Sequence, residues 1–136
     1  MRTPSTYLPR IIDSLLAERL EAFGAVLIEG PKWCGKTTTG AAAANSAFLL
    51  SDPANDFSNR TLATIDPAQA LIGANPRLVD EWQEVPKLWD AARFECDRRG
   101  EAGLFIFTGS ATPRDESQPM HSGAGRFSRL RMGTMT

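Results

Sequence analysis

The sequence predicts an α/β fold with a mainly parallel sheet of four to five strands flanked by helices. Short, continuous apolar runs alternate along the chain with longer segments of helical spacing, a pattern typical of parallel strands that are buried on both faces. A glycine-rich segment at residues 30–37 follows the first apolar run and precedes a helical segment. With 136 residues, of which 42% are hydrophobic, the chain has room for one domain with a buried core.

The first elements follow from the spacing of apolar residues. Residues 8–23 place apolar side chains at helical intervals with charges on the opposite face, which predicts an amphipathic helix ended by Gly24. Residues 25–28 form a continuous apolar run and predict a buried strand. The small residues from 36 to 44 predict a helix that packs close to the sheet, because alanine needs little space. A second strand is predicted at residues 47–50.

The second half of the chain continues the alternation. Residues 53–75 are mixed in composition, and the one element that we predict there is a short helix at residues 67–72. A helix at residues 85–99 is marked by Pro86 in its first turn, where proline is tolerated, and by Gly100 after its end. The remaining predictions are strands at residues 77–80, 104–107 and 126–132, and a loop at residues 111–125.

The segment GPKWCGKT at residues 30–37 matches the phosphate-binding pattern G-x-x-x-x-G-K-[ST] in the strand-to-helix context that this pattern requires. Its glycines let the backbone approach phosphate oxygens, and the helix that begins here adds a partial positive charge. We expect Lys36 to reach the β- and γ-phosphates of a nucleoside triphosphate and the Thr37 hydroxyl to bind Mg²⁺. The residues expected to contact the nucleotide are Gly30, Pro31, Lys32, Trp33, Cys34, Gly35, Lys36, Thr37 and Thr38.

Two carboxylates directly follow the apolar residues of the third predicted strand. Asp80 is expected to hold Mg²⁺ through water, opposite Thr37. In ATPases of the additional-strand type the next residue is a glutamate that orients and deprotonates the attacking water, and Glu81 fills that place. The alternative reading is that acidic residues end a strand because strands end at the surface. Position after the phosphate loop favours the functional reading.

Hydroxyl groups and arginines complete the set of candidates. Thr108, rather than Ser110, is our choice for a group that senses the γ-phosphate or places the water, although a hydroxyl that caps a turn is the alternative. Arg126, Arg129 and Arg131 are candidates for neutralising charge in the transition state, in the same subunit or from a neighbour, and Arg126 is the one that we include in the site. Their alternative role is to keep an edge strand soluble.

The composition limits which binding partners and which cellular compartment are expected. The formal net charge of -1 indicates neither nucleic acid nor an anionic membrane surface as a partner. The apolar runs are far shorter than the roughly 20 residues needed to cross a bilayer. Two cysteines are too few for a disulfide framework, and the chain opens without a signal-like segment. We therefore expect a cytoplasmic protein.

These residues together resemble a family of prokaryotic AAA-type ATPases that are usually described only as ATP-binding proteins. The resemblance implies an AAA-type P-loop NTPase fold, ATP and Mg²⁺ as cofactors, and hydrolysis of ATP to ADP and phosphate with the roles given above to Lys36, Thr37, Asp80 and Glu81. The matching segments are YLPRIID at residues 7–13, the phosphate loop at residues 30–37, LVDEWQ at residues 78–83, FTGSAT at residues 107–112 and HSGAGR at residues 121–126.

Members of that family are longer than this chain and carry a second domain after the ATPase core. We expect the amphipathic helix to form an amino-terminal segment at residues 1–23, and the resemblance implies a truncated core at residues 24–136 with a fold that is incomplete at its carboxyl end. The expected partners are the nucleotide and either further copies of the chain or the second domain. Turnover is expected of the full-length protein, and binding is the better supported activity of this chain.

Two other functions fit parts of the same sequence. A small P-loop kinase could use Asp52, after the second predicted strand, to position an acceptor hydroxyl. A truncated nucleotide-binding module would keep the phosphate loop and never turn over. A GTPase is disfavoured because the sequence has no Asn-Lys-x-Asp motif for reading guanine.

Overall fold

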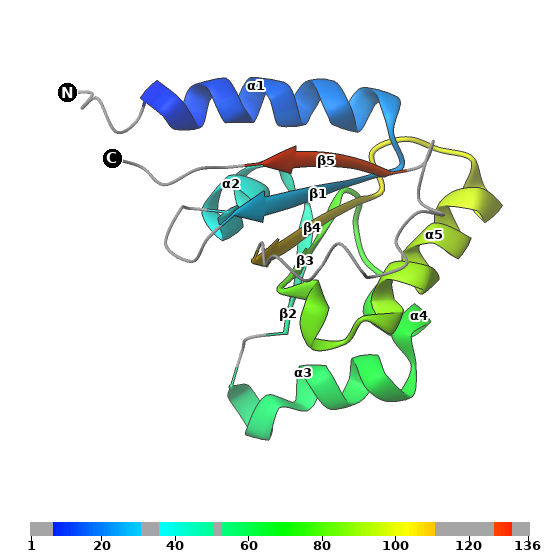
Figure 1. Ribbon diagram of the computed structural model, residues 1–136. Coiled ribbons are helices and arrows are strands. Elements are labelled where there is room, and N and C mark those ends of the chain that lie inside the picture. The colour runs from blue at the N-terminus through cyan, green and yellow to red at the C-terminus, as the bar shows by residue number, and fades with distance from the viewer. Residues whose placement is uncertain (1–6, 31–35, 51–52, 111–126, 132–136) are drawn as a thin grey trace.

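The computed structural model describes residues 7–30, 36–50, 53–110 and 127–131, in which helices and strands alternate (Figure 1). In chain order the elements are α1 (Tyr7–Ala22), β1 (Ala25–Gly30), α2 (Lys36–Ala43), β2 (Ser46–Leu49), α3 (Ala54–Ile65), α4 (Pro67–Ala70), β3 (Arg77–Asp80), the 3-10 helix η2 (Trp82–Glu84), α5 (Lys87–Arg99), β4 (Phe105–Ser110) and β5 (Phe127–Arg131). Within these described residues, no helix is long and apolar enough to cross a membrane.

The five described strands form one parallel sheet in the order β2-β3-β4-β1-β5. Strand β4 lies between β1, which leads into the phosphate-loop segment, and β3, which ends at Asp80. The register pairs Gly30 with Ser110 across β1 and β4, and Val79 with Phe107 across β3 and β4. The carboxyl ends of these three neighbouring strands therefore lie at the same edge of the sheet, toward which β1 and β4 point in Figure 1.

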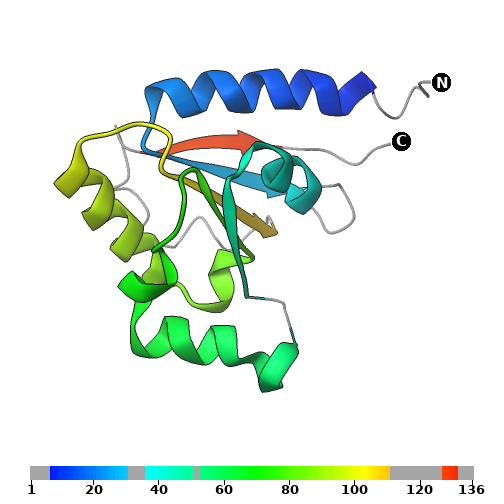
Figure 2. The same ribbon diagram turned by 180° about the vertical axis from the view of Figure 1, so that it is seen from behind.

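Helices cover both faces of the sheet, with α1 and α2 on one side and α3, α4 and α5 on the other (Figures 1 and 2). Strand β1 is buried along its whole length. Its Val26 packs with Leu16 of α1, whereas Leu27 packs in the opposite layer with Leu88 of α5. Two-sided burial explains why this strand reads as a continuous apolar run, and it confirms the predicted α/β fold.

The prediction for residues 53–75 missed a helix of 12 residues, α3. Of the apolar side chains that the structure describes in α3, Ala63 is buried, whereas Leu62 is 39% and Ile65 76% exposed. Polar side chains attach it to the end of β2 instead: the Asn59 amide donates to the carbonyl oxygen of Leu49 and the Arg60 guanidinium to that of Leu50, both over 2.9 Å. Helix α3 is nevertheless more amphipathic than α1 or α5. It was missed because its Asn, Asp and Ser residues are typical of loops.

Strand β4 is longer than predicted. Its predicted end was residue 107, but pairing with β1 continues through Thr108, Gly109 and Ser110. Thr108 thus lies inside the sheet, opposite Ile28, and does not begin a turn. The hydroxyl of Thr108 is consequently held at a fixed position among the strand ends.

Helix α2 packs close to the sheet as predicted, and a glycine adds to the effect of the alanines. Ala41 and Ala42 are exposed, but Ala43 and Ala44 are partly buried against the apolar cluster on this face of the sheet. Gly40 faces the sheet, where an added Cβ would lie 2.8 Å from Cδ1 of Leu78. The missing side chain of Gly40 therefore allows the close approach that brings the start of α2 to the strand ends.

Candidate functional site

The polar groups singled out in the sequence meet at the carboxyl edge of the sheet. Lys36 begins α2, Asp80 ends β3 and Thr108 lies near the end of β4. Lys36 and Asp80 are each 4% exposed, and Thr108 is fully buried. Buried polar and charged groups are costly unless they are paired, and at this edge several of them are paired with one another.

Asp80 is bonded to two of its neighbours through one carboxylate oxygen. The hydroxyls of Thr37 and Thr108 each donate to Oδ1 of Asp80 over 2.8 Å. Three segments, α2, β3 and β4, are therefore joined at a single atom. The same bonds orient the carboxylate, because hydrogen bonds to an ionised acceptor are the strong ones.

Glu81 has a left-handed backbone conformation, with φ of 56° and ψ of 54°. Among the described residues it is the one residue other than glycine with a positive φ. This backbone conformation costs about 1–2 kcal/mol. The backbone N–H of Glu81 donates to Oγ1 of Thr108 over 3.1 Å. The strained backbone turns the chain away from the strand directly after Asp80, and such strain is often found at functional sites.

The carboxylate of Glu81 faces the phosphate-loop lysine. Its Oε2 lies 3.9 Å from Nζ of Lys36, and its Oε1 accepts a hydrogen bond of 2.6 Å from the side-chain amide of Gln83. The side chain of Glu81 is 17% exposed, more than that of Lys36. A partly accessible carboxylate is thus held beside a buried ammonium group at the strand ends.

Thr108 holds both acidic residues. Its hydroxyl donates to Asp80 and accepts from the backbone of Glu81, so its geometry is that of a positioning residue. Our expectation that this hydroxyl senses the γ-phosphate stays a prediction.

Replacing Thr108 by valine is expected to lower the free energy of unfolding by about 1–3 kcal/mol, because the Glu81 N–H loses its acceptor and the buried Asp80 loses a donor. Urea unfolding measures this loss. Thr108→Ser keeps the hydroxyl and is the matched control. If the valine variant is as stable as the serine variant, the two hydrogen bonds do not contribute as the geometry indicates.

The remaining predicted contacts of the nucleotide are only partly described. Gly30 ends β1 and Thr38 lies exposed on α2. The predicted contacts that lie outside the described residues are Pro31, Lys32, Trp33, Cys34 and Gly35, together with Arg126.

Two of the candidate arginines are attached to Glu29, the buried carboxylate next to Gly30 in β1. Nη1 of Arg129 lies 3.0 Å and Nη2 of Arg131 lies 3.8 Å from its carboxylate oxygens. Both arginines belong to β5, a strand at the edge of the sheet. From α1, Arg19 donates to Oγ of Ser128 over 2.7 Å and to the carbonyl oxygen of Arg129 over 2.9 Å. These contacts fasten β5 to its neighbours.

Three residues of this region were not singled out from the sequence. Gln83 and Gly109 stand inside the family-like segments, so the resemblance marked them without giving them a role. Glu29 directly precedes the phosphate loop. A carboxylate next to an apolar strand could have predicted a charged partner, because a buried charge needs one. The partners themselves come from distant parts of the chain and are not visible in the sequence.

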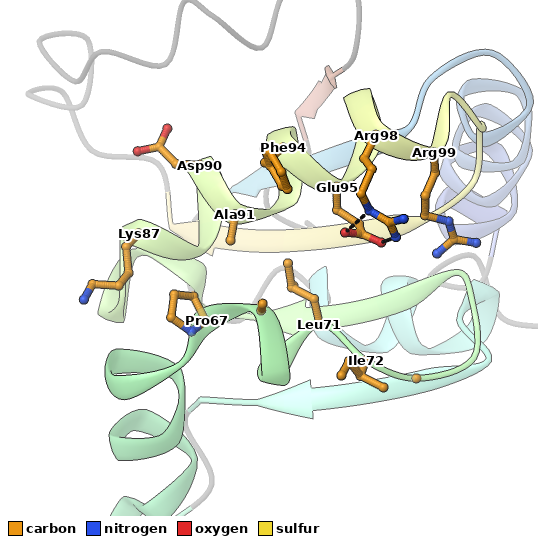
Figure 3. A pocket seen from close by; sticks show the side chains of 12 residues that line it. Pro67, Leu71, Ile72, Lys87, Asp90, Ala91, Phe94, Glu95, Arg98 and Arg99 are labelled. Atoms are coloured by element: carbon orange, nitrogen blue, oxygen red, sulfur yellow. Dashed lines mark hydrogen bonds and ion pairs between the residues drawn. The ribbon is translucent and has the colours of Figure 1, made fainter.

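A separate cavity of about 670 Å³ lies between α4 and α5 (Figure 3). Its lining includes Leu71, Phe94 and Glu95 and none of the candidate residues described above. Arg98 donates to Glu95 within α5, and this hydrogen bond lowers the pKa of the Glu95 carboxyl. The other charged side chains of the lining have partners outside it: Asp90 pairs with Arg93, Arg99 with Glu101, and Lys87 donates to the carbonyl oxygen of Thr64. They do not converge on one ligand position.

The fold and the described strand ends define a P-loop NTPase-like domain of the AAA type. The family model described as "AAA domain" matches residues 22–136, and the chain belongs to this family. This match confirms the resemblance found in the sequence. It makes the chain a nucleotide-binding, ATPase-like module.

Two mycobacterial proteins are similar to the chain. Each is 32% identical over 123 residues, which is 89% of this chain and 27% of the relative. They are the uncharacterized proteins Mb2031c of Mycobacterium bovis and Rv2008c of Mycobacterium tuberculosis. The chain thus spans about a quarter of the length of these curated relatives.

Proposed function

We propose that the chain binds ATP with Mg²⁺ and forms the core of an ATPase that hydrolyses ATP to ADP and phosphate. The observation that carries this proposal is the bonded group at the strand ends, in which Lys36 and Thr37 of α2 meet Asp80, Glu81 and Thr108. Membership of the AAA-domain family supports nucleotide binding. Hydrolysis, Mg²⁺ and the individual roles below are our own assignments.

Phosphate binding is assigned to the junction of β1 and α2. The start of α2 supplies partial positive charge, and Lys36 supplies a full one. Lys36 is 4% exposed and faces Glu81, so its ammonium is held at the strand ends and not in bulk solvent. An anion bound there would compete with Glu81 for the lysine.

The residues present suit Mg²⁺. Thr37 and Asp80 offer oxygen atoms, which are the ligands that this hard cation prefers. The Thr37 hydroxyl donates its proton to Asp80, so its lone pairs stay available to a cation. Among the described residues, no group of three or more His, Cys, Asp or Glu side chains could hold a metal alone, and Mg²⁺ commonly combines one or two protein groups with phosphate oxygens and waters. When bound, the ion would neutralise charge on the phosphates.

Glu81 is assigned the role of general base. A carboxylate that is partly exposed and fixed by Gln83 can accept a proton from a water molecule. The oxygen of that water attacks the γ-phosphorus, the bond to the β-phosphate oxygen breaks, and ADP and phosphate leave. The Thr108 hydroxyl positions Glu81 by accepting from the Glu81 backbone N–H, and it positions Asp80 by donating to the Asp80 carboxylate.

Residues 24–136 are proposed as the core that carries these steps, with α1 as a cover of one sheet face. The kinase alternative depended on Asp52, which lies outside the described residues. The acidic pair Asp80 and Glu81, with the family-like segments, supports transfer to water over transfer to an acceptor. Arg126, also outside the described residues, stays a prediction as the group that neutralises transition-state charge.

The purified chain is expected to gain thermal stability with Mg-ATP and to release phosphate without an added acceptor. At a free ligand concentration 100 times the Kd, the stabilisation is about 2.7 kcal/mol. Melting curves and a phosphate-release assay measure the two effects, with EDTA as the control that removes Mg²⁺. A thermal shift without phosphate release would identify a binding module without turnover. The absence of both effects would reject the proposal.

A further inference from the structure

We propose that Gln83 is a positioning residue that fixes the carboxylate of Glu81 in the catalytic site. This inference rests on the proposed function, since it assigns a role beside the general base. The contact that suggests it is the hydrogen bond of 2.6 Å from Nε2 of Gln83 to Oε1 of Glu81. The two residues are separated by one residue in a strained turn, and their side chains meet over the strand ends.

The orientation of the Gln83 amide is fixed by its partner. An ionised carboxylate only accepts hydrogen bonds, so the NH₂ group of Gln83 must face Glu81. The carbonyl Oε1 then points the other way, where it is buried and has no hydrogen-bond partner among the described residues. An unpaired buried acceptor is destabilising. Because the unpaired oxygen is unfavourable, the presence of Gln83 is better explained by the hydrogen bond from its NH₂ group to Glu81 than by a contribution to stability.

Within the described part of the chain, Lys36 and Gln83 contact the Glu81 carboxylate, and they differ in what else they must do. Lys36 lies 3.9 Å from Oε2, and the proposed function directs this lysine to the phosphates. Gln83 is neutral, so phosphate does not compete for it by charge. When Lys36 turns to the nucleotide, the hydrogen bond from Gln83 is the contact that continues to orient Glu81.

Gly109 of β4 leaves the space that Gln83 occupies. A Cβ added at Gly109 would lie 2.8 Å from Oε1 of Gln83 and 2.8 Å from Nε1 of Trp82, which is closer than real Cβ contacts. Trp82 anchors the same turn, because its ring lies 5.0 Å from that of the buried Trp89. The turn thus sits against a strand position that has no side chain, and a methyl group there would displace the amide.

The kinetic test compares Gln83→Ala with Gln69→Ala, an exposed glutamine of α4 that serves as the matched control. Loss of the amide is expected to lower kcat about 10- to 100-fold, the size expected when a reacting group is slightly misplaced. The affinity for Mg-ATP is expected to stay unchanged. Gly109→Ala should lower kcat in the same way, and Gln83→Ala should cause no further loss in a Glu81→Gln background, since the two residues act as a unit.

A second measurement does not depend on turnover. The sequence contains three glutamines, at positions 69, 83 and 118, and four asparagines, at positions 45, 55, 59 and 75. Seven side-chain NH₂ pairs are therefore expected, and the pair that is lost in Gln83→Ala is the one of interest. In the ¹⁵N-labelled protein without nucleotide, this NH₂ pair is expected to be shifted and slow to exchange with solvent. Glu81→Ala should return it to the position and exchange rate of a solvated glutamine.

The outcomes separate this inference from the proposed function. If Glu81→Gln hydrolyses ATP like the parent, the general base is wrongly assigned. If Glu81→Gln is inactive while Gln83→Ala keeps the parent kcat, only the role of Gln83 is rejected. A rise in kcat for Gln83→Ala would also reject it, because the amide would then restrain the base. If the chain releases no phosphate, the NH₂ signal decides. The inference is rejected if Glu81→Ala leaves the chemical shift and exchange rate of the Gln83 NH₂ pair unchanged, and it is supported if they change.

Discussion

Replacing Lys36 by alanine is expected to weaken ATP binding at least about 30-fold, because truncating one partner of a buried charge pair typically costs 2–5 kcal/mol or more. The lysine is 4% exposed at the start of α2, so no solvent-exposed group can easily replace its charge. Titration calorimetry with Mg-ATP measures the loss. Tryptophan fluorescence offers a second reading, since Trp33 lies inside the predicted phosphate loop, and a Trp33→Phe variant separates its signal from those of Trp82 and Trp89.

Lys87→Ala is the matched control for this experiment. Lys87 is the exposed first residue of α5, and its ammonium donates to the carbonyl oxygen of Thr64, outside the candidate site. Its loss should leave the Kd for ATP unchanged. A Lys36→Ala variant that binds ATP like the parent would show that residues 30–37 do not bind phosphate in the way proposed.

Replacing Glu81 by glutamine is expected to keep ATP binding and to lower phosphate release about 10²- to 10⁴-fold, the contribution typical of a general base. The amide retains the shape of the side chain but cannot take a proton from water. It also removes the negative charge 3.9 Å from Lys36, so the affinity for ATP should be equal to or higher than that of the parent. Steady-state kinetics and a binding titration on the same preparation separate the two effects.

Glu84→Gln controls for the loss of a nearby acidic charge. Glu84 is exposed, lies three residues after Glu81 and contacts Arg60 over 3.7 Å, a surface pair of the kind that contributes little. Its variant should hydrolyse ATP like the parent. Equal losses of turnover in the two variants would indicate an effect of net charge and would contradict the assignment of Glu81 as base.

The fold could be predicted where buried residues form a recognisable apolar pattern in the sequence. The continuous apolar runs of β1 and β3 predicted these buried strands, whereas α3 was missed because its Asn, Asp and Ser residues are typical of loops. The hydrogen bonds of Asn59 and Arg60 to backbone carbonyls join α3 to β2, and such partners are not visible in the sequence. The predicted fold class and family were nevertheless confirmed, since the alternation of elements and the phosphate-loop pattern do not depend on α3.

The candidate site could be predicted for residues whose chemistry is local. Lys36 and Asp80 are recognisable from their neighbours in the chain, and the parallel sheet explains why they meet. The hydrogen bonds of Thr108 and Gln83 join segments whose relative position is set by packing and by a left-handed turn at Glu81. A sequence pattern does not encode such a turn at a residue other than glycine, so neither bond could be foreseen.

The contacts of Arg19 with β5 have a consequence for solubility. A strand at the border of a sheet offers backbone groups to which a strand from another molecule can add. The guanidinium of Arg19 already occupies the carbonyl oxygen of Arg129 and the hydroxyl of Ser128. Arg19 of α1 therefore makes these groups of β5 less available to a strand of another molecule, and its charge opposes the edge-to-edge pairing that leads to aggregates.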